Sequence, residues 1–95
     1  MDISDWRSEI DLIDAQILRL LKQRAEIVAE IGKSKALRGT AVIDRAREKQ
    51  ILKRVETEAN HPILSKRAAQ SVFRCIIDES RRIQTEIIQE TAQIC

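Results

Sequence analysis

An unbroken apolar periodicity at the start of the chain constrains the fold more than any other feature. Gly32 lies inside this pattern and costs about 1 kcal/mol relative to alanine, yet good helix formers follow it as far as Gly39. Ser4 or Asp5 can cap the segment, so we predict one helix over residues 5–38. The apolar side chains that recur at the three- and four-residue steps of one helix face are Trp6, Ile10, Ile13, Ile17, Leu20, Leu21, Ile27, Val28 and Ile31.

Two shorter helices are predicted beyond the short loop that begins at Gly39. Asp44 is a natural cap for a helix over 45–59, and Asn60-His61-Pro62 breaks that helix. Ser65 can cap a third helix over 65–91. The inward-facing apolar residues are Ile51, Leu52 and Val55 in the shorter helix and Ala69, Val72, Phe73, Ile76, Ile77, Ile83, Ile87 and Ile88 in the last. The expected fold class is all-α, a single domain with one long, one short and one medium helix.

Composition agrees with helices and excludes several function classes. Two glycines, one proline and no tyrosine disfavour strand-rich folds, whereas 34% charged and 43% hydrophobic residues suit amphipathic helices. A net charge of +2, from 17 basic and 15 acidic residues, leaves no basic stripe for nucleic acid. No apolar run approaches the roughly 20 residues of a membrane span. We therefore expect a cytoplasmic protein that binds neither nucleic acid nor membrane.

The two cysteines indicate neither a disulfide framework nor a metal site. Cys75 and Cys95 lie far apart and have no CxxC or histidine companion. We expect Cys75 to be a small apolar filler and Cys95 a loose terminal residue.

The predicted first helix is too long for the rest of the chain to cover. About 35 residues span about 50 Å at 1.5 Å per residue. A second copy packed antiparallel would bury the stripe, with six helices from two chains sharing one core. We therefore predict an intertwined six-helix homodimer. A monomeric three-helix bundle is the alternative, and it would leave much apolar surface exposed.

Two basic residues of the first helix are placed to flank one small ligand. Arg24 and Lys35 are eleven residues apart, which is about 16 Å along the axis and within about 20° of the same face. Both lie beside the apolar stripe, where an unpaired charge would cost several kcal/mol. A bound anion would remove that cost. The alternative is that both long side chains extend from the edge of the stripe to solvent.

Polar groups on the other two predicted helices can likewise have either a structural role or a role in binding a ligand. Asp44, Arg47 and Glu48 open the second helix beside free backbone amides, where capping and the helix dipole alone can explain both acids. Ser80 and Gln84 lie one turn apart on the apolar face of the third helix. Such core-facing groups need partners, which interhelical hydrogen bonds or a ligand can supply.

Arg7 cannot meet the same ligand from the same chain. It lies seventeen residues before Arg24, about 26 Å away on a straight helix. In an antiparallel dimer the start of the partner helix passes beside the middle of the first helix. Two equivalent sites, each using Arg7 of the partner subunit, then follow from symmetry.

Taken in order, these residues form a set that spans the chain from Arg7 to about Ile88. The set consists of Arg7, Asp14, Arg24, Gly32-Lys33-Ser34-Lys35, Asp44-x-x-Arg47-Glu48 and Ser80-x-x-x-Gln84. It resembles the all-helical bacterial chorismate mutases, with spacing that needs essentially no gap. No single piece is specific, but the combination in this order is.

The resemblance implies an isomerase that rearranges chorismate, a small dicarboxylate, to prephenate without covalent intermediate, metal or cofactor. Such a rearrangement needs a reactive conformer and stabilised developing charges. The implied catalytic residues are Lys35, Gln84, Glu48 and Arg24. The implied substrate-binding residues are Arg7 of the partner subunit with Arg24, Lys35, Asp44, Arg47, Glu48, Ser80 and Gln84 of one chain.

The resemblance also implies roles for these residues. Arg24 and the partner's Arg7 would hold a carboxylate, and Ser80 would assist at a carboxylate. Lys35 and Gln84 would donate to the ether oxygen as it gains negative charge. Glu48, helped by the backbone near Asp44, would accept from the ring hydroxyl. The role of Arg47 is left open.

Three other functions remain open at this point. A mutase acting on 4-amino-4-deoxychorismate would place an ammonium at Glu48, and an isochorismate pyruvate lyase would use the same cationic site for an elimination. A non-catalytic helical dimerisation module would need only the apolar stripes. Arg81 departs from the family, where an apolar residue is usual. It either points to solvent with Arg82 or alters which chorismate derivative is accepted.

Overall fold

The computed structural model of the chain describes residues 1–94, so the expectation for Cys95 lies outside the described residues. Its three regular elements are the helices α1 (Ile3–Arg38), α2 (Arg45–Glu58) and α3 (Lys66–Ile94). One long, one short and one medium helix, with no strand among the described residues, confirm the all-α prediction.

Local hydrogen bonds explain where α1 begins and ends. The backbone amide of Asp5 donates to Asp2 Oδ1 at 3.1 Å, and the amide of Asp2 donates to Asp5 Oδ2 at 3.0 Å. This reciprocal capping box makes Asp2 the cap. The predicted cap at Ser4 or Asp5 is therefore wrong, because both lie inside the helix and Asp5 is its third residue. Gly39 ends the helix with φ of 66°, in the left-handed region that glycine adopts without strain.

The caps predicted for the two shorter helices are confirmed. Asp44 Oδ1 accepts from the amide of Arg47 at 3.0 Å, and Ser65 Oγ accepts from the amide of Ala68 at 3.1 Å. Between them, His61 Nδ1 accepts from the amides of Ile63 and Leu64, both at 3.1 Å, and so orders the turn. The predicted break at residues 60–62 follows directly after α2.

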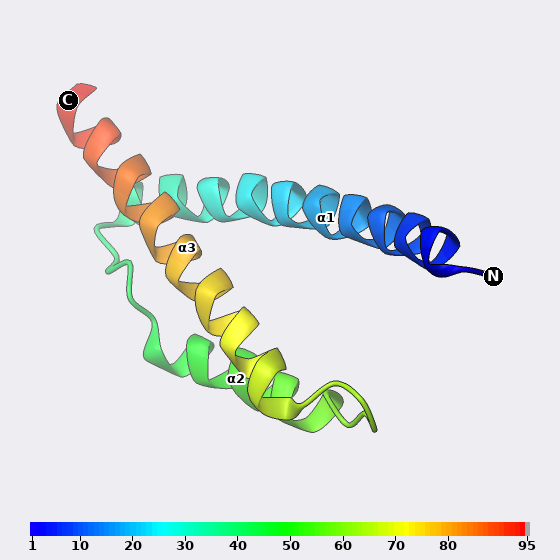
Figure 1. Cartoon of the computed structure of the whole chain (residues 1–95). Coiled ribbons are helices and arrows are strands. Elements are labelled where there is room, and N and C mark those ends of the chain that lie inside the picture. The colour runs from blue at the N-terminus through cyan, green and yellow to red at the C-terminus, as the bar shows by residue number, and fades with distance from the viewer. Residues whose placement is uncertain (95) are drawn as a thin grey trace.

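The helices form an open arrangement, with α3 packed against both α1 and α2 (Figure 1). The amino-terminal half of α1 projects away from the other two helices (Figure 1). The radius of gyration is 17.0 Å, whereas a compact chain of this length has about 12 Å. The single chain is therefore not the compact three-helix bundle that we considered as an alternative.

Few side chains are buried within one chain. Among residues 1–92, whose burial is described, the buried apolar residues are Val28, Val55 and Ile77, one from each helix. Gly32 is buried as well, because a Cβ added there would lie 3.2 Å from Ile87 Cβ and 3.3 Å from Gln84 Cα. The glycine that interrupted the helix pattern thus allows α1 and α3 to approach closely.

Most of the predicted apolar stripe of α1 remains uncovered in the single chain. Its exposed members are Trp6, Ile10, Ile13, Ile17, Leu20, Leu21, Ile27 and Ile31. Val72 is also exposed, and Cys75 is exposed rather than a buried filler, so both predictions are wrong for one chain alone. The periodicity predicted the helix, but of the predicted stripe this chain by itself buries only Val28. None of the described helices combines the length and apolar character needed to cross a membrane.

Candidate active site

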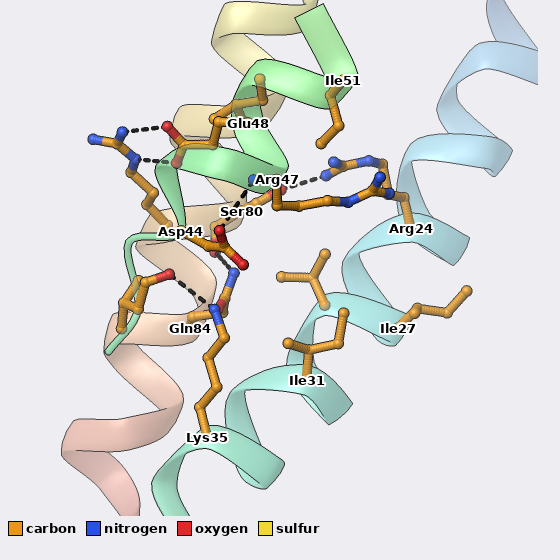
Figure 2. Close-up of a pocket in the computed structure, with 14 residues that line it drawn as sticks. Arg24, Ile27, Ile31, Lys35, Asp44, Arg47, Glu48, Ile51, Ser80 and Gln84 are labelled. Atoms are coloured by element: carbon orange, nitrogen blue, oxygen red, sulfur yellow. Dashed lines mark hydrogen bonds and ion pairs between the residues drawn. The ribbon is translucent and has the colours of Figure 1, made fainter. Parts of the chain in front are cut away.

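A cavity of about 390 Å³ opens where α1, α2 and α3 face one another (Figure 2). This volume lies within the range of small-molecule sites, about 300–1,000 Å³. Its polar lining includes all seven site residues that the sequence predicted from one chain, namely Arg24, Lys35, Asp44, Arg47, Glu48, Ser80 and Gln84. Its apolar lining is Ile27, Val28, Ile31, Val42, Ile51 and Ile77. Residues distant in sequence therefore surround one ligand-sized space.

Arg24 joins α1 to α3 at the wall of the cavity. Its Nη1 donates to Ser80 Oγ, and that hydroxyl donates in turn to the carbonyl of Ile76 at 3.0 Å. Burial lowers the pKa of the Arg24 guanidinium, and the positive charge of Arg47 lowers it further. Both effects disfavour the charged form, which a bound anion would stabilise. Arg24 lines the cavity rather than extending to solvent.

Lys35 lies at the opposite end of the cavity from Arg24. Its Nζ donates to the carbonyl of Val42 at 2.9 Å, in the loop that connects α1 to α2. This bond fixes the ammonium at the cavity wall and leaves two of its three donors for a ligand. Asp44, two residues after Val42, caps α2 and lines the same cavity.

Gln84 contributes a buried amide with one unused atom. Its Nε2 donates to the Ser80 carbonyl at 3.2 Å, whereas Oε1 is buried without a partner. The residue is 8% exposed. Buried polar atoms are nearly always paired, so an unpaired one that lines a cavity indicates a ligand or a rotation of the amide.

Glu48 is the most strongly held charge of the site. Its two oxygens accept from Arg81, Oε2 from Nε at 2.7 Å and Oε1 from Nη2 at 2.5 Å, and Arg74 Nη1 lies 3.8 Å from Oε1. The hydrogen bonds from Arg81 lower the pKa of Glu48, and the charges of Arg81, Arg74 and Arg45 add to this effect. The carboxylate therefore stays ionised in mild acid. Arg81 does not point to solvent with Arg82, because it lines the cavity and pairs with Glu48.

The cavity carries an excess of positive charge. Its cationic side chains are Arg24, Lys35, Arg47 and Arg81, and its anionic ones are Asp44 and Glu48. The net charge of the lining is therefore +2. Within residues 1–94, no ion pair joins Arg24, Lys35 or Arg47 to a carboxylate. A ligand with two negative charges would balance this lining.

The sequence pattern of the family described as "Chorismate mutase type II" matches residues 6–85. The chain belongs to this family. The match covers α2 completely and most of α1 and α3, so it includes every residue of the cavity. The fold unit described above is a chorismate mutase domain.

Individual relatives agree with the family match. The bifunctional chorismate mutase/prephenate dehydratase of Escherichia coli is 32% identical over 84 residues, which cover 88% of this chain and 22% of the relative. The chorismate mutase of Methanocaldococcus jannaschii is 25% identical over 89 residues, which cover 94% of this chain and 90% of the relative. The intracellular chorismate mutase of Mycobacterium tuberculosis is 40% identical over 53 residues, which cover 56% of this chain and 50% of the relative. The chain thus spans about a fifth of the length of the bifunctional relative.

Arg7 is the one predicted site residue that the chorismate mutase domain does not bring to the cavity. It lies in the projecting amino-terminal part of α1 and is exposed. This position agrees with the expectation that Arg7 cannot serve the site of its own chain.

Two residues of the site were missed in the sequence. The carbonyl of Val42 fixes Lys35, and no side-chain pattern marks a backbone acceptor. Arg74 contacts Glu48, and it precedes Arg81 by seven residues, which places both on one face of α3. That spacing was available in the sequence as a signal.

Proposed function

We propose that this chain converts chorismate to prephenate at the cavity between its three helices, in the cytoplasm and as a homodimer with two sites. The observation that carries the proposal is the cavity lining, with its net charge of +2 and three cations without a carboxylate partner among the described residues. Membership of the family supports the reaction, and the relative named as intracellular supports the compartment.

The two carboxylates of the substrate supply the missing negative charges. Arg24 and the partner's Arg7 hold one carboxylate through paired guanidinium donors, and the Ser80 hydroxyl assists. Arg47 lies on the α2 side of the cavity, where its charge already affects Arg24. We assign it to the second carboxylate. Binding both groups fixes the substrate in the compact conformer from which the rearrangement starts.

Lys35 and Gln84 stabilise the charge that develops during the reaction. The carbon–oxygen bond of the ether breaks as a carbon–carbon bond forms, and the ether oxygen gains negative charge. The Lys35 ammonium donates to this oxygen. Gln84 donates to it once its amide rotates, because Nε2 now donates to the Ser80 carbonyl. Both donors act more strongly on the transition state than on the ground state, so they raise kcat.

Glu48 accepts a hydrogen bond from the ring hydroxyl of the substrate. A carboxylate has about four lone-pair positions. The two bonds from Arg81 use one on each oxygen, and the remaining positions can accept from the hydroxyl.

The exposed stripe of α1 supports the homodimer. The chain exposes 7804 Å², whereas a compact monomer of this length exposes roughly 5,600 Å². The excess of roughly 2,200 Å² per chain is of the size that obligate homodimers bury. An antiparallel partner helix covers this stripe and brings the partner's Arg7 to the Arg24 end of the cavity.

The test is turnover of chorismate, followed by its ultraviolet absorbance, with the product identified by mass spectrometry. Wild type should give saturable conversion to prephenate, and Lys35→Ala should lower kcat at least about 100-fold, as loss of a charged transition-state donor does. Lys33→Ala is the matched control, because Lys33 is exposed and pairs with Glu30 at 3.0 Å. A wild type without turnover, or equal losses in both variants, would contradict the proposal.

A further inference from the structure

Among the described residues, Glu48 is the only hydrogen-bond and ion-pair partner of the Arg81 side chain. Its guanidinium donates to both oxygens of that carboxylate, from Nε to Oε2 at 2.7 Å and from Nη2 to Oε1 at 2.5 Å. The two dashed lines that end on Glu48 mark these bonds (Figure 2). The side chain of Glu48 is 14% exposed and that of Arg81 is 36% exposed. A parallel pair of this kind fixes both the position and the charge state of the acid.

The neighbouring arginine does something different. Arg82 donates to Glu79 at 2.6 Å and to Glu86 at 2.7 Å, all within the exposed face of α3. It does not line the cavity, whereas Arg81 does. Two adjacent arginines thus separate into one surface residue and one residue that acts on the site.

The charge around Glu48 determines which substrate group it can receive. With Arg81 bound at both oxygens and Arg74 at 3.8 Å, this cluster of one acid and two bases carries a net positive charge. A neutral hydroxyl can still donate to a free lone pair of the carboxylate. An ammonium placed there would meet the same lone pair but also the repulsion of two guanidinium groups.

We propose that Arg81 is a specificity-determining residue, which holds Glu48 in an ion pair so that the site accepts a ring hydroxyl and rejects a ring ammonium. This inference rests on the proposed function, since it takes the cavity as the chorismate site. Arg81 acts through Glu48 and is a positioning residue. It does not touch the reacting atoms.

The experiment compares kcat/KM for chorismate and for 4-amino-4-deoxychorismate in wild type, Arg81→Met, Arg81→Lys and Arg82→Met. Arg81→Met removes the charge but keeps an apolar side chain. The ratio of kcat/KM for 4-amino-4-deoxychorismate to kcat/KM for chorismate should therefore rise at least about tenfold, because one positive charge that repels the ammonium is gone. Arg81→Lys keeps the charge without the fork and should stay within about threefold of the wild-type ratio. Arg82→Met should leave the ratio unchanged.

A pH profile separates this role from a merely structural one. The groups around Glu48 are Arg81 and Arg74 on α3 and Arg45 on α2, and all three hold its pKa low. Without Arg81 the acid limb of the kcat/KM profile on chorismate should move to higher pH. General damage to the fold would lower both activities together and leave their ratio and the acid limb in place.

The outcomes are distinguishable. A wild type that converts neither compound contradicts the proposed function. In that case, binding affinities for the two compounds, measured by calorimetry in wild type and in Arg81→Met, still test the inference through the ratio of the two affinities. An unchanged ratio in Arg81→Met, or an equal rise in Arg82→Met, overturns the inference even if wild type is an efficient mutase. A wild type that prefers the amino compound overturns it as well.

Discussion

At the scale of single residues, the charges of the cavity are paired unevenly. Glu48 has two arginine partners, whereas the guanidinium of Arg24 has a hydroxyl as its hydrogen-bond acceptor and lies near a second guanidinium. Protein interiors rarely leave cations without a carboxylate unless a ligand supplies it. The acid is therefore structurally fixed, whereas the cations that lack a carboxylate partner among the described residues can still bind an anion.

The pairing of Glu48 predicts a pH-dependent contribution to stability. The pKa of Glu48 is lowered in the folded state, so its stabilising contribution is complete above its unfolded pKa of about 4.3. This contribution is lost as pH falls through the folded value. Glu48→Gln should therefore be less stable than wild type at pH 7, and the difference should shrink below about pH 4.

Urea unfolding at several pH values measures this difference. Glu30→Gln is the matched control, because Glu30 belongs to an exposed pair with Lys33, and such pairs contribute little. A gap between Glu48→Gln and wild type that stays constant from pH 7 to pH 3 would show that the ion pair with Arg81 is not its cause.

At the scale of helices, one glycine sets how closely α1 and α3 pack at the site. A methyl group on Gly32 would lie 3.2 Å from Ile87 Cβ and 3.3 Å from the backbone of Gln84. Neither atom is the end of a flexible side chain. The contact therefore helps to position the Gln84 amide, which we propose as a catalytic donor, through the helix backbone.

Gly32→Ala should damage the site despite its higher helix propensity. The higher helix propensity of alanine should add about 1 kcal/mol to the free energy of unfolding. Overpacking typically lowers that free energy by about 1–3 kcal/mol, so we expect a net loss of about 1 kcal/mol. Displacement of Gln84 should lower kcat about tenfold, because a misplaced donor loses much of its effect. Steady-state kinetics and urea unfolding measure both.

Ser34→Ala serves as the control for Gly32→Ala, because Ser34 is an exposed residue of the same helix. This variant gains helix propensity without making a new contact, so its free energy of unfolding and its kcat should be no lower than those of wild type. A Gly32→Ala variant with full activity and raised stability would show that the close approach of the helices does not matter.

Helices were predictable because their signals are local. Asp44 and Ser65 cap helices through their own side chains, within three residues of the amides they bind. Asp2 was missed because the cap was sought at the start of the apolar stripe, whereas the capping box extends one turn further. Gly32 was identified as a cost to the helix and as part of the family motif, but its contact with α3 was missed, since that contact depends on how two helices pack.

The candidate site was predictable where helix geometry alone relates its members. Arg24 and Lys35 share a face of one helix, and both line the cavity. The pair of Arg81 with Glu48 joins residues on different helices, and no periodicity specifies that distance. The sequence could therefore indicate the chemistry of the site but not how its acid is held.

At the scale of the whole molecule, one chain leaves most of the apolar stripe of α1 uncovered. Its extents of 58 × 26 × 14 Å are those of an elongated body, and the amino-terminal half of α1 extends away from α2 and α3 (Figure 1). The stripe on that half is apolar and exposed. A second copy would cover the stripe and complete the site with the same segment, since Arg7 lies on it.

The most direct test of this account is complementation between two inactive variants. Arg7→Ala and Arg24→Ala should each lose nearly all activity. When the two are unfolded together and refolded as a mixture, about half of the dimers contain one of each chain, and one of their two sites has both arginines intact. The account predicts recovery of about a quarter of wild-type activity. A mixture no more active than the separate variants, with dimers shown to exchange chains, would contradict a site shared between two copies.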